Sequence, residues 1–221
     1  MVPQLRTSLL FPDPSTASES GVLAYGGDLS PSRLLLAYRN GIFPWYSVND
    51  PILWWSPNPR LIMNLDDFKL RRSLRKKLNR FEIRFDTAFE EVITRCGSKF
   101  RENQKGSWIM PEIVEAYTTL HHMGHAHSVE AFYEGELVGG LYGICVGKVF
   151  CGESMFADMS DASKVAFAYL IEHLKEKNYD FIDAQIPTEH LKSLGAIEVH
   201  RDYFLNRLRE ATKDIEVVSS W

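Results

Sequence analysis

The chain has 221 residues, of which 45% are hydrophobic, and its 25 Lys and Arg against 29 Asp and Glu give a formal net charge of −4. This size and composition predict one or two globular domains with an ordinary apolar core. The acidic balance excludes a polycation, so any contact with nucleic acid must come from a local basic patch.

Neither a targeting segment nor a membrane span is expected. The opening residues, MVPQLRTSLLFPDP, lack the continuous apolar run of a signal peptide, and no stretch approaches the ~18 apolar residues of a transmembrane helix. The three cysteines, Cys96, Cys145 and Cys151, are odd in number and lack zinc-type spacing. We therefore expect a cytoplasmic protein whose thiols are reduced and partly buried, with no membrane contact.

The N-terminal part is rich in Pro, Gly and Trp and is expected to form a small domain over residues 1–64. Its one clear helix is SPSRLLLAYRNG, with Ser30 as N-cap, Pro31 in the first turn and Gly41 at the end. The flanking stretches LAYGGDLS and GIFPWYSVNDPILWWSPNPR predict loops that carry aromatic side chains.

Residues 65–221 are expected to form a larger domain, which begins with alternating helices and strands. DDFKLRRSLRKKLNR predicts a basic helix, and RFEIRFD predicts a strand because apolar and polar residues alternate. TAFEEVITRCGS predicts a helix capped by Asp86, and PEIVEAYTTLHHMG predicts a helix that stops at Gly124.

Residues 127–156 contain three β-rich runs separated by EGE and VGK, which predicts an antiparallel meander. A long amphipathic helix follows, capped by Ser160 or Asp161. YDFIDAQI then predicts a strand and TEHLKSLGA a short helix, while EVHRDYFLNRLREATKD is ambiguous between strand and helix.

This order of elements predicts an α+β fold with a mixed, largely antiparallel sheet, and it resembles the order in GNAT-type N-acyltransferases. In those enzymes a Gly-rich turn before a helix cradles the pyrophosphate of coenzyme A. Here the corresponding segment, MFADMSDASKVAF, has no glycine and carries Asp158 and Asp161, which repel anions. Coenzyme A is therefore not expected as the acyl donor, and no cofactor is predicted.

Three polar residues stand out in apolar surroundings. Glu153 lies in the segment VFCGESMF, where a buried carboxylate is costly unless something pairs with it. Asp183 and Gln185 are two apart on a predicted strand and so share one face. The alternatives are a salt bridge to an internal Arg or Lys for Glu153, and a capping or sheet-edge pair for the other two.

Two clusters of polar residues, a histidine string and a basic segment, raise the question of a binding role. The string HHMGHAH places His121 and His125 four apart, but Gly124 interrupts the helix and no Cys or carboxylate lies at ligand spacing, so no metal site is expected. Residues 69–80 hold seven Lys or Arg in twelve. This segment is either a solvated face or a salt-sensitive, sequence-independent contact with phosphates, and the candidate contacts are Arg71, Arg72, Arg75, Lys76, Lys77 and Arg80.

Several unusual strings occur together: GGDLSPSRLLLAYRNGIFPWYS, PILWWSPNPR, GSWIMPEIVEAYTTLHHMGHAHSVE, ELVGGLYG, FCGESMF and IDAQIPTEHLKSLGA. From about Gly21 to Tyr203 the chain resembles the leucyl/phenylalanyl-tRNA–protein transferase family. The resemblance implies a monomeric enzyme with a GNAT-like C-terminal domain. Such an enzyme transfers Leu or Phe, with Met as a further candidate, from aminoacyl-tRNA to proteins that begin with Arg or Lys, and so marks them as N-degrons.

The resemblance also implies roles for the residues. Glu153 would hold the N-terminal residue of the acceptor, while Asp183 and Gln185 would assist removal of a proton from the attacking amine. The basic segment would contact the tRNA acceptor stem. The residues implied in donor binding are Trp45, Trp108 and Tyr117 around the terminal adenosine, and Leu141, Met155, Phe167 and Leu170 in an apolar pocket for the aminoacyl side chain.

For most of these apolar residues plain core packing is the alternative, and it is the preferred interpretation for Trp54 and Trp55. Two other function classes also stay open. An ordinary GNAT acetyltransferase is disfavoured by the missing pyrophosphate loop. A non-catalytic tRNA-binding module would use the basic segment and the tryptophans but would have no use for Glu153, Asp183 and Gln185.

Overall fold

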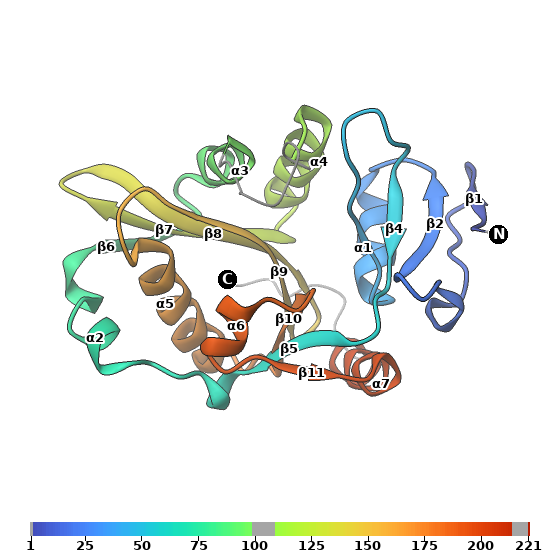
Figure 1. The fold of residues 1–221 in the computed structure, drawn as a ribbon. Coiled ribbons are helices and arrows are strands. Elements are labelled where there is room, and N and C mark those ends of the chain that lie inside the picture. Colours follow the sequence, from blue (N-terminus) through green and yellow to red (C-terminus); the bar gives the residue numbers. More distant parts are fainter. Residues whose placement is uncertain (1, 99–108, 214–220) are drawn as a thin grey trace.

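The structure is a computed structural model of the whole chain that describes residues 2–98, 109–213 and 221. Two sheets organise these residues (Figure 1), a four-stranded sheet in the order β1-β2-β4-β3 and a seven-stranded sheet in the order β11-β5-β10-β9-β8-β7-β6. The smaller sheet and helix α1 (Pro31–Arg39) form the N-terminal part. The predicted α+β class with a small N-terminal part is confirmed.

Three of the four strands of the smaller sheet lie largely in stretches that the sequence predicts as loops, and that prediction was wrong there. Its strands are very short, and they are β1 (Gln4–Leu5), β2 (Val22–Gly26), β3 (Phe43–Pro44) and β4 (Leu53–Trp55). Pro44 has no N–H to donate to a ladder, and it is tolerated because β3 lies at the edge of the sheet. Strands this short, interrupted by proline, contain too few residues to show the alternation of apolar and polar side chains that indicates β-structure.

The larger sheet contains the predicted meander, which consists of β7 (Ala126–Tyr133), β8 (Glu136–Val146) and β9 (Val149–Ala157). Strand β6 (Glu82–Phe85) pairs antiparallel with β7 at one edge. At the other side of the sheet lie β10 (Phe181–Gln185), β5 (Arg60–Asn64) and β11 (Ile197–Val199). The expected division after residue 64 stays a prediction, although β5 precedes it and pairs within this sheet.

Helices cover both faces of the larger sheet (Figure 1). On one face lie α3 (Phe89–Ser98) and α4 (Pro111–His122), and on the other lies α5 (Ala162–Glu176). The start of α5 packs tightly on β8, since a Cβ added at Gly139 would lie 2.6 Å from that of Ala162. The order α3, α4, meander, α5, β10 is the GNAT-like order that the sequence predicts.

The C-terminal stretch, ambiguous in sequence, contains both structures. After the short helix α6 (Glu189–Ser193) comes β11, and then α7 (Arg201–Thr212), which is capped by the side chain of His200. All three cysteines are buried and none is in a disulfide. Within the part of the chain that the structure describes, no helix is both long and apolar enough to span a bilayer.

The predicted basic helix over residues 66–80 was wrong. The structure has one turn of helix, α2 (Arg72–Arg75), flanked by 3₁₀ turns at Leu65–Asp67 and Leu78–Arg80. The helix caps predicted at Asp86 and at Ser160 or Asp161 also differ in detail from those in the structure. Asp86 accepts hydrogen bonds from the backbone of Ser128 and pairs with His127, and Asp161 is the N-cap of α5 but its side chain makes no capping bond.

Parallel strands β9 and β10 diverge, and this divergence positions the site. They pair only through Val149–Cys151 and Phe181–Asp183. Beyond Cys151, β9 continues to Ala157 against β8 alone, while β10 bulges between Asp183 and Gln185. A space therefore opens between the ends of two strands in the middle of the sheet.

Candidate active site

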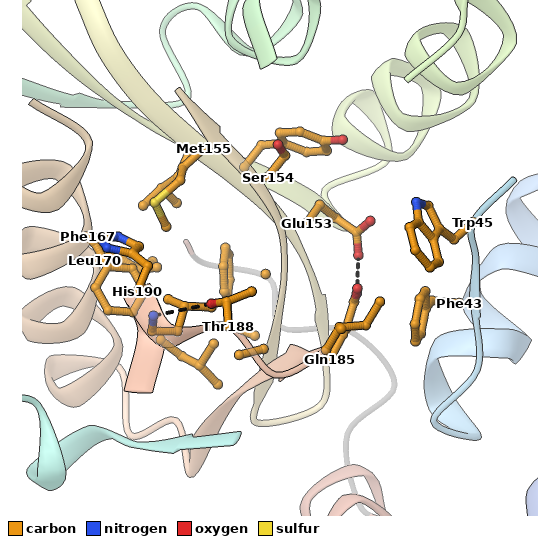
Figure 2. Close-up of a pocket in the computed structure, with 18 of the residues that line it drawn as sticks. Phe43, Trp45, Glu153, Ser154, Met155, Phe167, Leu170, Gln185, Thr188 and His190 are labelled. Atoms are coloured by element: carbon orange, nitrogen blue, oxygen red, sulfur yellow. Dashed lines mark hydrogen bonds between the residues drawn. The ribbon is translucent and has the colours of Figure 1, made fainter. Parts of the chain in front are cut away.

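A cavity of about 510 Å³ fills the space between β9 and β10 (Figure 2). Its floor and sides come from β8, β9, β10 and α5, and one wall comes from Phe43, Pro44 and Trp45 at the edge of the smaller sheet. The cavity therefore draws residues from both sheets, and it has an apolar end and a polar end.

The apolar end contains the four residues expected to hold an aminoacyl side chain. Leu141 and Met155 are cross-strand partners on β8 and β9, and Phe167 and Leu170 are three apart on α5, which puts them on one helix face. All four line the cavity. Figure 2 shows Met155, Phe167 and Leu170 close to His190, on the opposite side from Trp45.

The polar end is formed around Glu153. Its Oε1 accepts hydrogen bonds from the hydroxyl of Tyr38 at 2.8 Å and from Nε2 of Gln185 at 2.7 Å. The hydroxyl of Tyr117 lies 2.5 Å from that of Tyr38 and 3.4 Å from Oε2 of Glu153. Since Tyr38 gives its only proton to Glu153, Tyr117 donates to Tyr38. Among the described residues, Oε2 of Glu153 has only the long contact with the Tyr117 hydroxyl.

The environment of Glu153 raises the pKa of its carboxyl to about 7, chiefly because burial disfavours the charged form. The hydrogen bonds from Tyr38 and Gln185 act in the opposite direction. Among the described residues the structure shows no ion pair between Glu153 and an Arg, Lys or His, so the alternative of an internal salt bridge gains no support there. A carboxyl group of this kind is partly ionised near neutral pH and can take up a proton.

Asp183 is not exposed to the cavity. It forms a bidentate ion pair with Arg60, with Nε–Oδ1 at 2.8 Å and Nη2–Oδ2 at 2.6 Å, and both side chains are buried. Its Oδ1 also accepts the backbone N–H of Gln185 at 3.0 Å. Gln185 has a left-handed φ of 63° at the bulge, and this turn directs its amide to Glu153. The alternative of a capping pair is thus partly correct, because Asp183 caps the bulge.

The tryptophans divide between cavity and core. Trp45 is half-buried in the cavity wall, while Trp54 is fully buried and donates to the carbonyl of Gly26. Trp55 packs beside Trp45, with ring centroids 5.3 Å apart. The expected core role of Trp54 is confirmed. Trp108 lies outside the described residues, and Tyr117 is fully buried behind Glu153 instead of in the cavity wall.

The basic segment is a set of exposed cations on a short anchored turn. Leu74 buries its side chain, while the exposed cations are Lys69, Arg71, Arg72, Arg75, Lys76 and Arg80. Lys77 differs because it pairs with Asp161 at 2.5 Å, and Lys164 pairs with the same carboxylate at 3.0 Å. The start of α5 is therefore less acidic than the sequence alone indicates.

The histidine string has a structural role. His121 closes α4, with its Nδ1 2.8 Å from the carbonyl of Ala126 and its ring stacked on Phe89. His127 pairs with Asp86. Within residues 2–98, 109–213 and 221, no cluster of three or more His, Cys, Asp or Glu is arranged to hold a metal ion.

Sequence reasoning missed several residues of the site. Tyr38 and Arg60 support Glu153 and Asp183, and Phe43 and His190 line the cavity. Both Tyr38 and Arg60 lie in strings that carry the family resemblance, and this was the only signal that could have found them. No local pattern connects residues that meet only in the folded chain.

The chain thus has an α+β fold in which two diverging strands of the larger sheet enclose a cavity with a carboxylate in its wall, an arrangement that suits an enzyme. The chain belongs to the leucyl/phenylalanyl-tRNA–protein transferase family. The family model described as "Leucyl/phenylalanyl-tRNA protein transferase" matches residues 62–209. The model for the N-terminal domain of the same family matches residues 27–58. The protein is therefore an aminoacyltransferase.

Relatives of similar sequence align with nearly the whole chain. The leucyl/phenylalanyl-tRNA–protein transferase of Sulfurimonas denitrificans is 63% identical over 97% of this chain and 95% of its own, and that of Maridesulfovibrio salexigens is 53% identical over 96% and 90%. Among solved structures, L-PGS from Bacillus licheniformis has a TM-score of 0.41 at 15% identity, covering 73% of this chain and 52% of that one. An aminoglycoside acetyltransferase from an uncultured soil metagenomic sample has a TM-score of 0.40 at 17% identity, covering 66% and 97%.

Proposed function

We propose that the protein transfers Leu or Phe, with Met as a further donor, from aminoacyl-tRNA to the α-amino group of proteins that begin with Arg or Lys. The observation that carries this proposal is one cavity with an apolar end and, at its other end, a carboxylate without a cationic partner among the described residues. A donor with an apolar side chain and an acceptor with positive charge suit these two ends.

The donor side chain would enter between Met155 and the α5 residues Phe167 and Leu170. An unbranched, polarisable Met adapts to apolar groups of different shape, which supports a site that accepts more than one donor. Trp45, half-buried in the opposite wall, would stack on the terminal adenosine, a contact worth roughly 1–3 kcal/mol for each base.

The reaction would be aminolysis of an ester, and it needs a group that accepts a proton from the acceptor's α-ammonium group. We assign this role to Glu153. An α-ammonium group, whose ordinary pKa is about 7.7–8.0, must lose one proton before it attacks the carbonyl carbon. The new C–N bond forms, the C–O bond to the tRNA breaks, and the second proton leaves with the 3′ oxygen. Glu153 would bind the ammonium and take the first proton, since its pKa of about 7 suits this transfer.

Gln185 and Asp183 would orient the reacting groups and would not store the proton. A glutamine amide is a very poor base, and both oxygens of Asp183 already accept hydrogen bonds. These contacts support a role in which Asp183 fixes Gln185 and Gln185 fixes Glu153. The acyl group arrives as an activated ester, so we expect no cofactor requirement.

The basic segment would bind phosphates of the tRNA. Its exposed cations lie on a turn anchored by Leu74, next to the start of α5 through the ion pair of Lys77 with Asp161. Contacts of this kind are insensitive to base sequence, so any tRNA with the right aminoacyl group would serve. We further propose that the enzyme acts as a monomer in the cytoplasm and that its products are N-degrons.

The test is transfer of labelled Leu from leucyl-tRNA to peptides that begin with Arg, Lys, Asp or Ala. We expect label on the Arg and Lys peptides alone. Label on the Asp peptide would keep the chemistry and overturn the acceptor assignment. Bound tRNA without transfer to any peptide would favour a binding module, and transfer of acetyl from acetyl-coenzyme A would favour an ordinary acetyltransferase.

A further inference from the structure

A buried arginine stands behind the polar wall of the cavity. Arg60 is 1% exposed, and its guanidinium lies between two aromatic rings, 4.9 Å from the ring centroid of Phe43 and 4.5 Å from that of Phe204. Phe43 also lines the cavity. The side chain is thus fixed from both faces, and its planar fork meets Asp183 edge to edge.

The hydrogen bonds continue from this ion pair to the carboxylate at the polar end. Asp183 accepts the backbone N–H of Gln185, which holds the left-handed turn, and the Gln185 amide donates to Glu153. We propose that Arg60 is a positioning residue of the transferase, which holds Gln185 against Glu153 through Asp183. This inference rests on the proposed function of Glu153 and adds a residue to it.

Stability alone is a poor reason for such a pair. A buried ion pair often contributes no more than apolar residues of similar volume, because both charges must leave water. In addition, Nη1 of Arg60 is buried without a hydrogen-bond partner among the described residues, which is unfavourable. Because this arrangement adds little stability, we infer that the guanidinium serves to fix the orientation of Asp183, and through it that of Gln185.

The substitution Arg60→Lys tests the orientation, because a lysine keeps the charge but cannot bind both carboxylate oxygens in one plane. We expect kcat to fall by about 10-fold or more while KM for aminoacyl-tRNA changes by less than about 3-fold. We also expect the acid limb of the pH–rate profile to move to higher pH, because the Gln185 hydrogen bond that favours the ionised Glu153 is weakened. The titratable groups that face Glu153 are Tyr38 on α1, Tyr117 on α4, Cys151 on β9 and Asp183 on β10, and Arg60 on β5 lies behind Asp183.

The matched control is Arg33→Lys. Arg33 is equally buried and is paired with Asp28 at 3.2 Å, but it binds the backbone carbonyls of Arg6 and Ser8 and does not line the cavity. A general reduction in stability would affect both variants. Only the substitution at Arg60 is expected to change the pH–rate profile, and an equal change in both variants would overturn the proposal.

A second variant and a second readout separate this inference from the proposed function. The double variant Arg60→Met/Asp183→Leu removes both charges at similar volume, so we expect it to fold and to have the same low kcat. Wild-type rates in this folded variant would overturn the role of Arg60. Titration of the ¹³C-labelled Glu153 carboxyl, assigned with Glu153→Gln, needs no activity. A higher midpoint in Arg60→Lys supports positioning even if the wild type transfers no Leu, and an unchanged midpoint contradicts it.

Discussion

Glu153 is the side chain on which the proposed chemistry depends. We expect Glu153→Gln to lower kcat by about 100-fold or more, the usual scale when general acid–base catalysis is removed. The amide has nearly the shape of the carboxylate and its oxygen can still accept from Tyr38 and Gln185, so the affinity for aminoacyl-tRNA should change little. Single-turnover transfer and a filter-binding titration measure the two quantities on the same sample.

The control for this substitution is Glu172→Gln on the exposed face of α5, where the carboxylate lies 3.9 Å from the ammonium of Lys175. It should leave kcat unchanged. If Glu153→Gln kept the wild-type rate, the carboxylate would be neither the base nor the anion that binds the acceptor.

Met155 is the residue through which donor choice can be tested. It is only partly buried and faces the cavity opposite Phe167 and Leu170. Met155→Ala should lower kcat/KM for leucyl-tRNA by about 10- to 100-fold, since removing methylene groups from an apolar pocket weakens discrimination by ~1–3 kcal/mol. Met159→Ala is the control, because Met159 packs on the same core but does not line the cavity. Equal decreases in both variants would contradict a donor pocket at Met155.

At the level of single residues, sequence reasoning found many of the side chains around the cavity but missed Tyr38 and Arg60, which hold the polar residues in place. Glu153 attracts notice because a carboxylate is unusual in an apolar strand. Its partner Tyr38 is 115 residues away in the chain, and Arg60 is 123 residues from Asp183. Separations of this size leave no periodic or local signal, so from the sequence only the strings that carry the family resemblance could have indicated Arg60 and Tyr38.

The basic segment shows how element prediction failed. Apolar Leu70, Leu74 and Leu78 recur every four residues, which favours a helix. Like charges at the same spacing, such as Arg71 with Arg75, repel each other on a helix surface. The structure keeps the leucines packed on the core and breaks the helix after one turn. By contrast, the meander was predictable because alternation and tight turns are local signals.

This segment is also where tRNA affinity can be tested. We expect the double substitution Arg72→Gln/Arg75→Gln to weaken tRNA binding. The slope of log affinity against log salt should decrease by roughly 0.7–0.9 for each phosphate that the variant no longer neutralises. The control is Arg209→Gln/Lys213→Gln, in the last turn and at the C-cap of α7, which lies at the opposite side of the molecule in Figure 1. If both pairs changed the slope equally, the cations would act through net charge and not as a docking surface.

At the scale of the whole molecule, the site depends on both sheets. The seven-stranded sheet supplies the diverging strands and Glu153, while α1 and β3 of the N-terminal part supply Tyr38, Phe43 and Trp45. Arg60, at the start of β5, lies over the ring of Phe43 and pairs with Asp183. The candidate site therefore draws on both parts, and neither contains the polar end of the cavity alone.

The cost of a half-buried carboxyl should be visible in the stability of the entire fold. The pKa of Glu153 lies at about 7 in the folded chain against an ordinary value of 4.5. Between these values the folded protein binds a proton that the unfolded chain has released, so this group makes stability fall as pH rises from 4.5 to 7. The buried Glu130 acts in the same direction, because its pKa is raised. His125 and His173, whose pKa values are lowered by burial, act in the opposite direction near 6.5.

These groups titrate over overlapping pH ranges, so the stability curve of the wild type alone does not isolate Glu153. The prediction therefore compares the wild type with Glu153→Gln. Relative to the wild type, Glu153→Gln should gain on the order of 1–3 kcal/mol in free energy of unfolding between pH 5 and pH 7.5, after allowance for solvent that reaches the cavity. Urea denaturation at the two pH values measures this difference, and Glu172→Gln should show none. If the curves of wild type and Glu153→Gln stayed parallel, the Glu153 carboxyl would titrate at its ordinary pKa. It would then be fully ionised at neutral pH, able to bind the acceptor's ammonium group but poorly matched to take its proton.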